Sequence, residues 1–203
     1  MEKDELKREK IVRNGYNEIA SIYNEIRNRF NNEKELMHFA SLLPKRAKVL
    51  DAGCGAGVPV AKFLVEQGFS VIGIDIAVNM LEIAKTQVPE AEFLEGDMTQ
   101  LTFPDAIFDG VVSLYAIIHV PREKHELIFQ NFYRILRPGG ILFFCTGTDD
   151  WEGSDDYYGA TMFWSHFSAE KSLELVKRTG FSVISDEIIE RGGETQYWVF
   201  AKK

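Results

Sequence analysis

Apolar residues in the first part of the chain recur three or four positions apart. One series runs from Ile19 to Ile26 and a second from Leu36 to Leu43. This spacing places the apolar side chains on one face of a helix. Pro44 follows the second series, and a proline there is typical of a helix end. We therefore predict helices over residues 1–44.

From Lys48 the pattern changes to short apolar strands that alternate with helix-like runs. The predicted strands cover residues 49–50, 70–74, 91–94, 108–114 and 141–145, and the predicted helices cover 58–66, 78–86 and 122–136. This alternation indicates right-handed crossover units, and nearly continuous apolar strands indicate a sheet covered on both faces. The pattern predicts a doubly wound α/β fold with a mostly parallel sheet.

Two details of the middle region follow from the same pattern. The buried stripe of the helix at 122–136 is expected to consist of Leu127, Ile128, Phe132 and Ile135. The segment Pro138-Gly139-Gly140 is expected to separate this helix from the next strand.

The last part of the chain has a different pattern. Ser168 is a candidate N-cap for a helix that runs to about Arg178, and Gly180 is a candidate stop. Strand-like runs at 181–189 and 195–201 flank Arg191-Gly192-Gly193, and paired glycines there indicate a hairpin. We expect the sheet to end in an antiparallel pair.

The composition is that of an acidic globular protein. Of the 203 residues, 45% are hydrophobic and 27% are charged, which suits one domain: a helical cover over 1–44 and a core over 45–203. The net charge of −8 repels phosphate backbones, so no nucleic acid partner is expected. The most cationic stretch, Lys7–Arg13, is interleaved with acids and is predicted to be a solvated helix face.

Several other classes are disfavoured. The chain shows neither a membrane-length apolar run nor a signal-peptide pattern, so a cytoplasmic protein with no membrane partner is expected. Cys54 and Cys145 belong to no Cys-x-x-Cys pair. We therefore expect no metal site and no dithiol chemistry.

The strongest chemical signal is the segment from Val49 to Gly57, VLDAGCGAG. It lies between a predicted strand and a predicted helix, where open α/β sheets bind ligands, and its glycines allow close approach of a ligand. A dinucleotide fingerprint would need a third glycine where Val58 stands. Asp51, two residues before Gly53, would repel a pyrophosphate and attract a cation. S-adenosylmethionine is cationic and carries no phosphate, so the charge favours it over NAD or FAD.

This glycine segment resembles motif I of the class I S-adenosylmethionine-dependent methyltransferases. Other segments resemble the family in the same order: Phe69–Leu81 its second strand and helix, Glu95–Met98 the turn after strand three, Phe108–Val120 the fourth strand and acceptor-facing loop, and Leu136–Gly140 the turn before strand five. Asn14–Tyr23 resembles the N-terminal helix of the small-molecule branch, which folds over the cofactor. The resemblance implies a Rossmann-like fold, S-adenosyl-L-methionine as methyl donor and S-adenosyl-L-homocysteine as product.

The resemblance also implies roles for single residues. Asp75, which ends strand two, would accept hydrogen bonds from both ribose hydroxyls, and Asp97 would bind the adenine amino group, although Gly-Asp is also a common turn pair. Asp51 either touches the donor or orients the loop, and Cys54 would contribute its backbone N–H rather than a reactive thiol. The other residues expected to contact the cofactor are Tyr16, Tyr23, Gly53, Gly55, Ile76, Met80, Gly96, Met98 and Ser113.

The methyl acceptor is not identified by the sequence. Ser113-Leu114-Tyr115-Ala116 stands where methylases acting on nucleic acids or glutamine carry Asn-Pro-Pro-Tyr, so a small-molecule acceptor is expected. His119 and Tyr115 are the candidate general bases, and a base is needed only if the acceptor must lose a proton. A structural role for His119 stays open, as does a non-catalytic S-adenosylmethionine-binding regulatory module.

Three further segments allow two interpretations each. Tyr16 and Tyr23 share one helical face, which fits core packing as well as cofactor covering. His166 stands in an aromatic cluster that either lines an acceptor pocket or packs as a loop. The acidic run Asp149–Asp156 is typical of a solvated loop, with room for a mobile lid.

Overall fold

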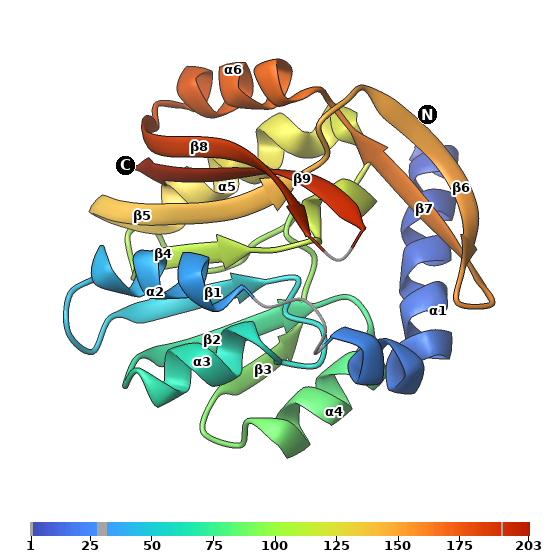
Figure 1. Cartoon of the computed structure of the whole chain (residues 1–203), viewed down its shortest axis with the longest axis horizontal. Helices are drawn as coiled ribbons and strands as arrows, with labels where there is room; N and C mark the ends of the chain where they lie inside the picture. Colours follow the sequence, from blue (N-terminus) through green and yellow to red (C-terminus); the bar gives the residue numbers. More distant parts are fainter. Residues whose placement is uncertain (1, 28–31, 192) are drawn as a thin grey trace.

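A seven-stranded sheet forms the centre of the molecule, in the order β3-β2-β1-β4-β5-β9-β8 (Figure 1). The computed structural model describes residues 2–27, 32–191 and 193–203. The strands of this sheet are β1 (Lys48–Ala52), β2 (Ser70–Asp75), β3 (Glu92–Glu95), β4 (Phe108–Ser113), β5 (Leu136–Thr146), β8 (Ser182–Arg191) and β9 (Glu194–Lys202).

Strands β1 to β5 run parallel to one another. β1 lies between β2 and β4, β3 pairs with β2, and β5 pairs with β4. β9 pairs antiparallel with both β5 and β8. The predicted parallel sheet and its antiparallel end are thereby confirmed, although Gly192 of the predicted turn lies outside the described residues. The carboxyl ends of β1, β2 and β4 meet at one edge of the sheet.

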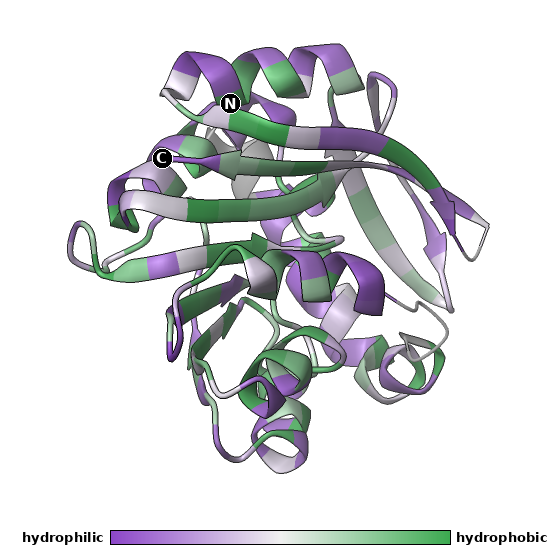
Figure 2. Ribbon diagram, turned by 60° about the vertical axis from the view of Figure 1, so that its left-hand side comes forward, coloured by the Kyte–Doolittle hydropathy of each residue, from purple (hydrophilic) through white to green (hydrophobic). Residues whose placement is uncertain are grey.

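Helices cover both faces of the sheet because its strands alternate apolar side chains between two buried clusters. α2, α3 and α4 pack on one face, and α5 and α6 on the other. Figure 2 shows hydrophobic residues along the central strands and mixed colouring on the helices. The helices are α1 (Glu2–Arg27), α2 (Glu33–Ser41), α3 (Val60–Glu66), α4 (Val78–Gln87), α5 (His125–Ile135) and α6 (Ala169–Thr179), with short 3-10 helices η1 (Ile117–His119) and η2 (Arg122–Lys124).

The ends of α6 are as predicted. The Ser168 hydroxyl accepts the Lys171 N–H, and Gly180 stops the helix in the left-handed conformation. The buried side of α5, in contrast, differs from the prediction. Leu127 is 42% exposed, whereas Phe129 is buried and contacts Phe144 of β5. The pattern could not separate these neighbouring apolar positions, and packing against β5 selects Phe129.

β5 begins earlier than predicted. It starts at Leu136 and includes Pro138-Gly139-Gly140, the segment predicted to separate helix and strand. The pairing is irregular here, because Phe108 faces Leu136 while Gly110 faces Ile141. Leu136 already pairs with β4, and Gly139 and Gly140 exchange backbone hydrogen bonds with Lys203, so these contacts extend the strand through a local sequence that favours a turn.

The acidic segment after β5 is a hairpin, so its prediction as a loop is wrong. β6 (Trp151–Tyr157) and β7 (Ala160–His166) pair antiparallel along their whole length and lie beside α1 (Figure 1). Asp155 and Asp156 are exposed, whereas Met162 and Phe163 of β7 are buried in a cluster with α1. A hairpin with one solvent-exposed face has a composition similar to that of a solvated loop, so the sequence did not distinguish the two.

α1 is also less solvated than predicted over Lys7–Arg13. Val12 is buried, and Arg8 and Glu9 are half-buried. In the described part of the chain, no helix combines the length and the apolar composition that crossing a bilayer requires.

Candidate active site

A cavity, here called the first cavity, lies at the carboxyl edge of the parallel strands, under α1. The predicted residues in its walls are Tyr16, Tyr23, Gly53, Gly55, Asp75, Ile76, Met80, Gly96, Asp97, Met98, Tyr115 and His119. The walls also contain Glu9, Val12, Thr99, Leu114, Ala116, Val120, Pro121 and Lys124, which the sequence did not indicate. The fold thus brings together residues from α1 and from four successive strand ends.

Three predicted residues lie outside the walls of this cavity. Asp51 and Cys54 line a smaller cavity that shares Gly53 and Gly55 with it. The Ser113 hydroxyl donates to the Ala52 carbonyl over 2.8 Å and is buried between β4 and β1. Ser113 therefore holds two strands together at the base of the site.

The glycine loop turns directly onto the end of β2. The backbone N–H groups of Gly53 and Cys54 both donate to the Ile74 carbonyl, at 2.8 and 3.0 Å. Gly53 has φ +78°, and a Cβ there would lie 2.2 Å from that of Ala116. Only glycine fits this position, because any side chain would clash and strain the backbone.

Asp75 joins the glycine loop to the start of α4. Its carboxylate accepts the Gly55 N–H at one oxygen and the Ala77 N–H at the other, both over 2.9 Å. Burial raises the pKa of Asp75, and these N–H groups oppose that shift. The carboxylate is held rigidly at the cavity wall, and each oxygen keeps a lone pair for a ligand hydroxyl.

Asp97 forms a turn and also lines the first cavity. Its carboxylate accepts the backbone N–H and the hydroxyl of Thr99, each over 2.7 Å. The Gly96-Asp97 pair is therefore a turn, as one interpretation of the sequence expected. That turn fixes the carboxylate in the wall of the cavity.

Asp51 is a buried carboxyl group with an unpaired oxygen. It is 1% exposed, and within the described residues its Oδ2 has no hydrogen-bond partner. Burial, together with the charge of Asp75, raises the pKa of Asp51 to about 8. Burial and the two carboxylates also raise the pKa of the Cys54 thiol, so this thiol is not activated. The surroundings of Asp51 favour a cation.

Tyr16 and His119 form a hydrogen-bonded pair in the cavity wall. His119 Nδ1 lies 2.7 Å from the Phe163 carbonyl, which can only accept, so Nδ1 carries the proton. Burial lowers the pKa of His119 to about 4, so the ring is neutral and Nε2 is an acceptor. The Tyr16 hydroxyl, 2.7 Å away, therefore donates to Nε2. Tyr16 lines the cavity, packs against a core cluster and belongs to a polar pair.

A second cavity adjoins the first. Both share Tyr16, Tyr23, Tyr115 and His119 in their walls. The remaining walls of the second cavity are Ile118, Gly147, Thr148, Tyr157, Trp164, His166, Glu194, Thr195 and Gln196. His166 thus lines a cavity and ends β7, so the predicted alternative of a packed loop is wrong. Side chains from α1, the β6–β7 hairpin and β9 meet here.

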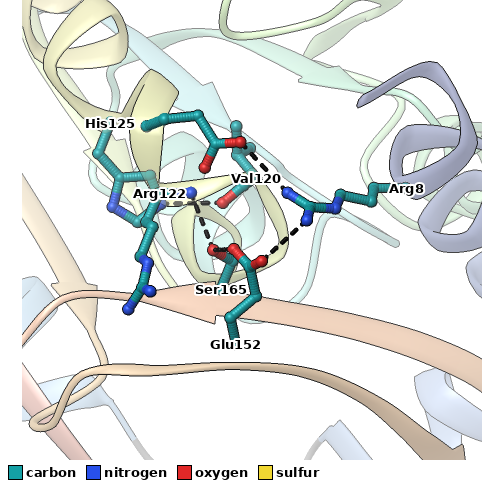
Figure 3. Close-up of polar contacts among 7 residues, drawn as sticks. Arg8, Val120, Arg122, His125, Glu152 and Ser165 are labelled. Carbon is teal, nitrogen blue, oxygen red and sulfur yellow. Dashed lines mark hydrogen bonds and ion pairs between the residues drawn. The ribbon is translucent and has the colours of Figure 1, made fainter. Parts of the chain in front are cut away.

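Polar contacts hold α1 against η2 and the β6–β7 hairpin, and α1 and this hairpin are here called the cover. Arg8 pairs with Glu123 of η2 at 3.2 Å and with Glu152 of β6 at 2.9 Å. The Ser165 hydroxyl donates to Glu152 and accepts the Arg122 backbone N–H, as Figure 3 shows. Arg8 therefore connects α1 to both η2 and β6.

Local sequence patterns could not show the Tyr16–His119 pair or the contacts of Arg8. Tyr16 and His119 lie 103 residues apart, and Arg8 and Glu152 lie 144 residues apart. Within the described residues, the structure contains no group of histidine, cysteine, aspartate and glutamate side chains suited to a metal ion.

Comparison with known proteins agrees with this geometry. A family model described as a methyltransferase domain matches residues 50–144. One relative is YqeM of Bacillus subtilis, which is named as a methyltransferase. It is 28% identical over 193 residues, covering 89% of this chain and 78% of that protein. The 2-methyl-6-phytyl-1,4-hydroquinone methyltransferase of Synechocystis is 34% identical over 145 residues, covering 70% of this chain and 44% of that protein.

The fold is similar to that of solved methyltransferases. One is the 1,6-didemethyltoxoflavin-N1-methyltransferase of Burkholderia thailandensis, solved with S-adenosylhomocysteine bound. Its TM-score is 0.69 and its identity 20%, over 92% of this chain and 85% of that one. With the glycine loop, the acidic strand ends and these relatives together, the chain belongs to the class I S-adenosylmethionine-dependent methyltransferases.

Proposed function

We propose that the first cavity binds S-adenosylmethionine and that the second binds a small-molecule methyl acceptor. The shared wall of Tyr16, Tyr23, Tyr115 and His119 carries this proposal, because methyl transfer requires donor and acceptor to meet across one boundary. A named relative acts on a hydroquinone, which supports a small organic acceptor here too.

Two features of the described residues fit the donor. Asp51 lines the smaller cavity that adjoins the first at Gly53 and Gly55, and its unpaired oxygen suits a ligand ammonium. The Gly53 backbone lines the first cavity without a side chain. Asp75 would hold the ribose hydroxyls and Asp97 the adenine. Tyr16 and Tyr23 would cover the ligand from α1, and Ile76, Met80 and Met98 would pack against it. When bound, S-adenosylmethionine supplies a methyl group already activated on sulfur.

The protein's part is to orient the acceptor, exclude water and accept a proton. Tyr16 is placed to contact an acceptor, since it lines both cavities, and His119 stands behind it with an unprotonated Nε2. A proton passing to the Tyr16 oxygen moves the Tyr16 proton to His119. His119 is therefore a positioning residue that relays this proton from Tyr16. Tyr115, whose backbone N–H donates to the Cys145 sulfur, is part of the wall.

The remaining proposals concern the whole protein. We propose a single domain over 1–203, since α1, the sheet and the hairpin share these cavities. Among the described residues, the lining of the second cavity includes Glu194 and neither lysine nor arginine, which supports an acceptor other than nucleic acid. The cytoplasmic location stays a prediction.

Calorimetry with S-adenosylmethionine and S-adenosylhomocysteine tests the donor site. Asp75→Asn should weaken both ligands at least tenfold, because each lost charge-assisted hydrogen bond is worth about 1.5–3 kcal/mol. Asp105→Asn, in an exposed ion pair with Arg134, is the matched control and should bind as wild type does. If wild type binds neither ligand, the donor site is misplaced.

A further inference from the structure

Five aromatic rings form a closed circuit in the wall of the second cavity. Tyr16 contacts Tyr23 at 5.2 Å between centroids, Tyr23 contacts Tyr157 at 6.3 Å, and Tyr157 contacts Trp164 at 5.5 Å. Trp164 then contacts His119 at 5.6 Å, and His119 returns to Tyr16 at 5.2 Å. All five side chains line this one cavity.

The angles between the rings describe a box rather than a slot. Tyr16 stands at 80° to Tyr23 and at 86° to His119, and Tyr157 stands at 86° to Trp164. A flat aromatic ligand stacks best between parallel rings. Rings at these angles do not form a parallel slot for a flat ligand, and a compact cation can contact several of them, since an aromatic ring attracts a cation within about 6 Å.

The polar groups of the cavity also favour a cation that donates hydrogen bonds. Gln196 is 9% exposed, and within the described part of the chain its Oε1 accepts no hydrogen bond. Glu194 supplies a carboxylate to the same walls. Burial lowers the pKa of His119 to about 4, so this ring adds no positive charge near neutral pH.

We propose that the methyl acceptor is a compact aliphatic amine, held as an alkylammonium by the circuit of Tyr16, Tyr23, Tyr157, Trp164 and His119. This deepens, and rests on, the proposed function. The ammonium gives one proton to Tyr16, whose own proton passes to His119. The freed nitrogen pair forms the N–C bond as the C–S bond breaks, leaving a methylated ammonium and neutral S-adenosylhomocysteine. His119 then returns its proton to water.

A binding experiment on the complex with S-adenosylhomocysteine separates charge from shape. Choline and its neutral isostere 3,3-dimethylbutan-1-ol have the same outline, so calorimetry should show choline binding at least about tenfold more tightly, from cation–π attraction. Equal binding, or tighter binding of the alcohol, overturns the proposal. Prior titration with S-adenosylhomocysteine alone shows whether the donor site works. If S-adenosylhomocysteine does not bind, the proposed function is contradicted, whereas the amine proposal is tested only by the choline comparison.

Variants of the hairpin assign the effect to the rings. Tyr157→Leu and Trp164→Leu should each weaken choline about tenfold while S-adenosylhomocysteine affinity stays within about twofold. Trp164→Phe should restore part of the loss, because it restores a ring. Tyr158→Leu is the matched control, since Tyr158 is 49% exposed on the same hairpin and lies outside the lining. Choline affinity unchanged in Tyr157→Leu would overturn the proposal even if a Trp164 variant failed to fold.

Discussion

At the scale of single residues, the site is built around carboxylates whose environments differ. Asp75 is satisfied by two backbone N–H groups, whereas Asp51 keeps an oxygen unpaired among the described residues and has its pKa raised to about 8. Burying the Asp51 carboxylate therefore costs folding free energy when no ligand is bound. A bound ammonium would relieve that cost, because an opposite charge favours the ionised carboxylate.

Asp51→Asn should stabilise the ligand-free protein and weaken donor binding. The folded pKa of Asp51 lies above its unfolded value, so wild-type stability from this group falls as pH rises from about 4 to 8. The variant escapes this loss, so its advantage in melting temperature should grow over that window, by about 2–4 °C per kcal/mol. Thermal melts with and without S-adenosylhomocysteine measure both effects. An advantage independent of pH would contradict the assigned cause.

Tyr16 and His119 should behave as one unit in catalysis. Tyr16→Phe and His119→Ala should each lower kcat about 100-fold, and the double variant should be little slower than either single one, because both break the same proton path. S-adenosylhomocysteine affinity of His119→Ala should stay within about threefold. Additive losses in kcat would show that the two residues act separately.

At the scale of elements, α1 and the β6–β7 hairpin form a cover whose parts are joined by Arg8. The Phe163 ring lies 5.1 Å from the Arg8 guanidinium carbon, so Arg8 also packs on β7. Side chains of the cover line both cavities, so we expect ligands to pass it when they bind or leave. We therefore expect the contacts that hold α1 in place to affect the rate of ligand exchange more strongly than they affect the stability of the fold.

Arg8→Ala should speed release of S-adenosylhomocysteine. Two partly exposed ion pairs contribute at most about 1 kcal/mol each, so stopped-flow dissociation should become about three- to tenfold faster. Arg178→Ala, which removes an exposed pair with Glu126 away from the cover, is the control and should release the ligand at the wild-type rate. Equal dissociation rates in wild type and Arg8→Ala would show that the Arg8 contacts do not control release of S-adenosylhomocysteine.

At the scale of the whole molecule, buried groups with opposite pH responses coexist. Burial lowers the pKa values of His119 and His125 to about 4. The unfolded chain therefore binds protons that the folded one does not between pH 6.5 and 4, and stability falls as pH falls through that window. Asp51 acts with the opposite sign over an overlapping range, so the two effects partly cancel.

His125→Asn isolates one histidine contribution. His125 lies outside the cavity linings, with Nε2 3.0 Å from the Val120 carbonyl, so activity should persist. Its stability difference from wild type, measured by urea unfolding, should shrink by up to about 3 kcal/mol between pH 7 and 4. A constant difference would mean that His125 titrates normally in the folded protein.

Local patterns were sufficient for most of the elements and for many of the residues that line the first cavity, the proposed donor site. Strand-helix alternation predicted the parallel sheet, and the order of the motifs placed Gly53, Asp75 and Asp97 at neighbouring strand ends. These follow from the sequence because each depends on residues within one turn or one crossover unit. The same patterns failed where a tertiary contact chose between local alternatives, as at Phe129 and through the acidic β6 strand.

The sequence by itself determined the fold class and the methyl donor, since a glycine turn and a strand-terminal acid carry their chemistry within a few residues. Only the tertiary structure decided which side chains line the second cavity, the proposed acceptor site. Tyr16, His119 and Trp164 come from α1, η1 and β7, and their rings meet solely because α1 and the hairpin pack over the sheet edge. No local spacing encodes that meeting, because it depends on how separate elements pack together.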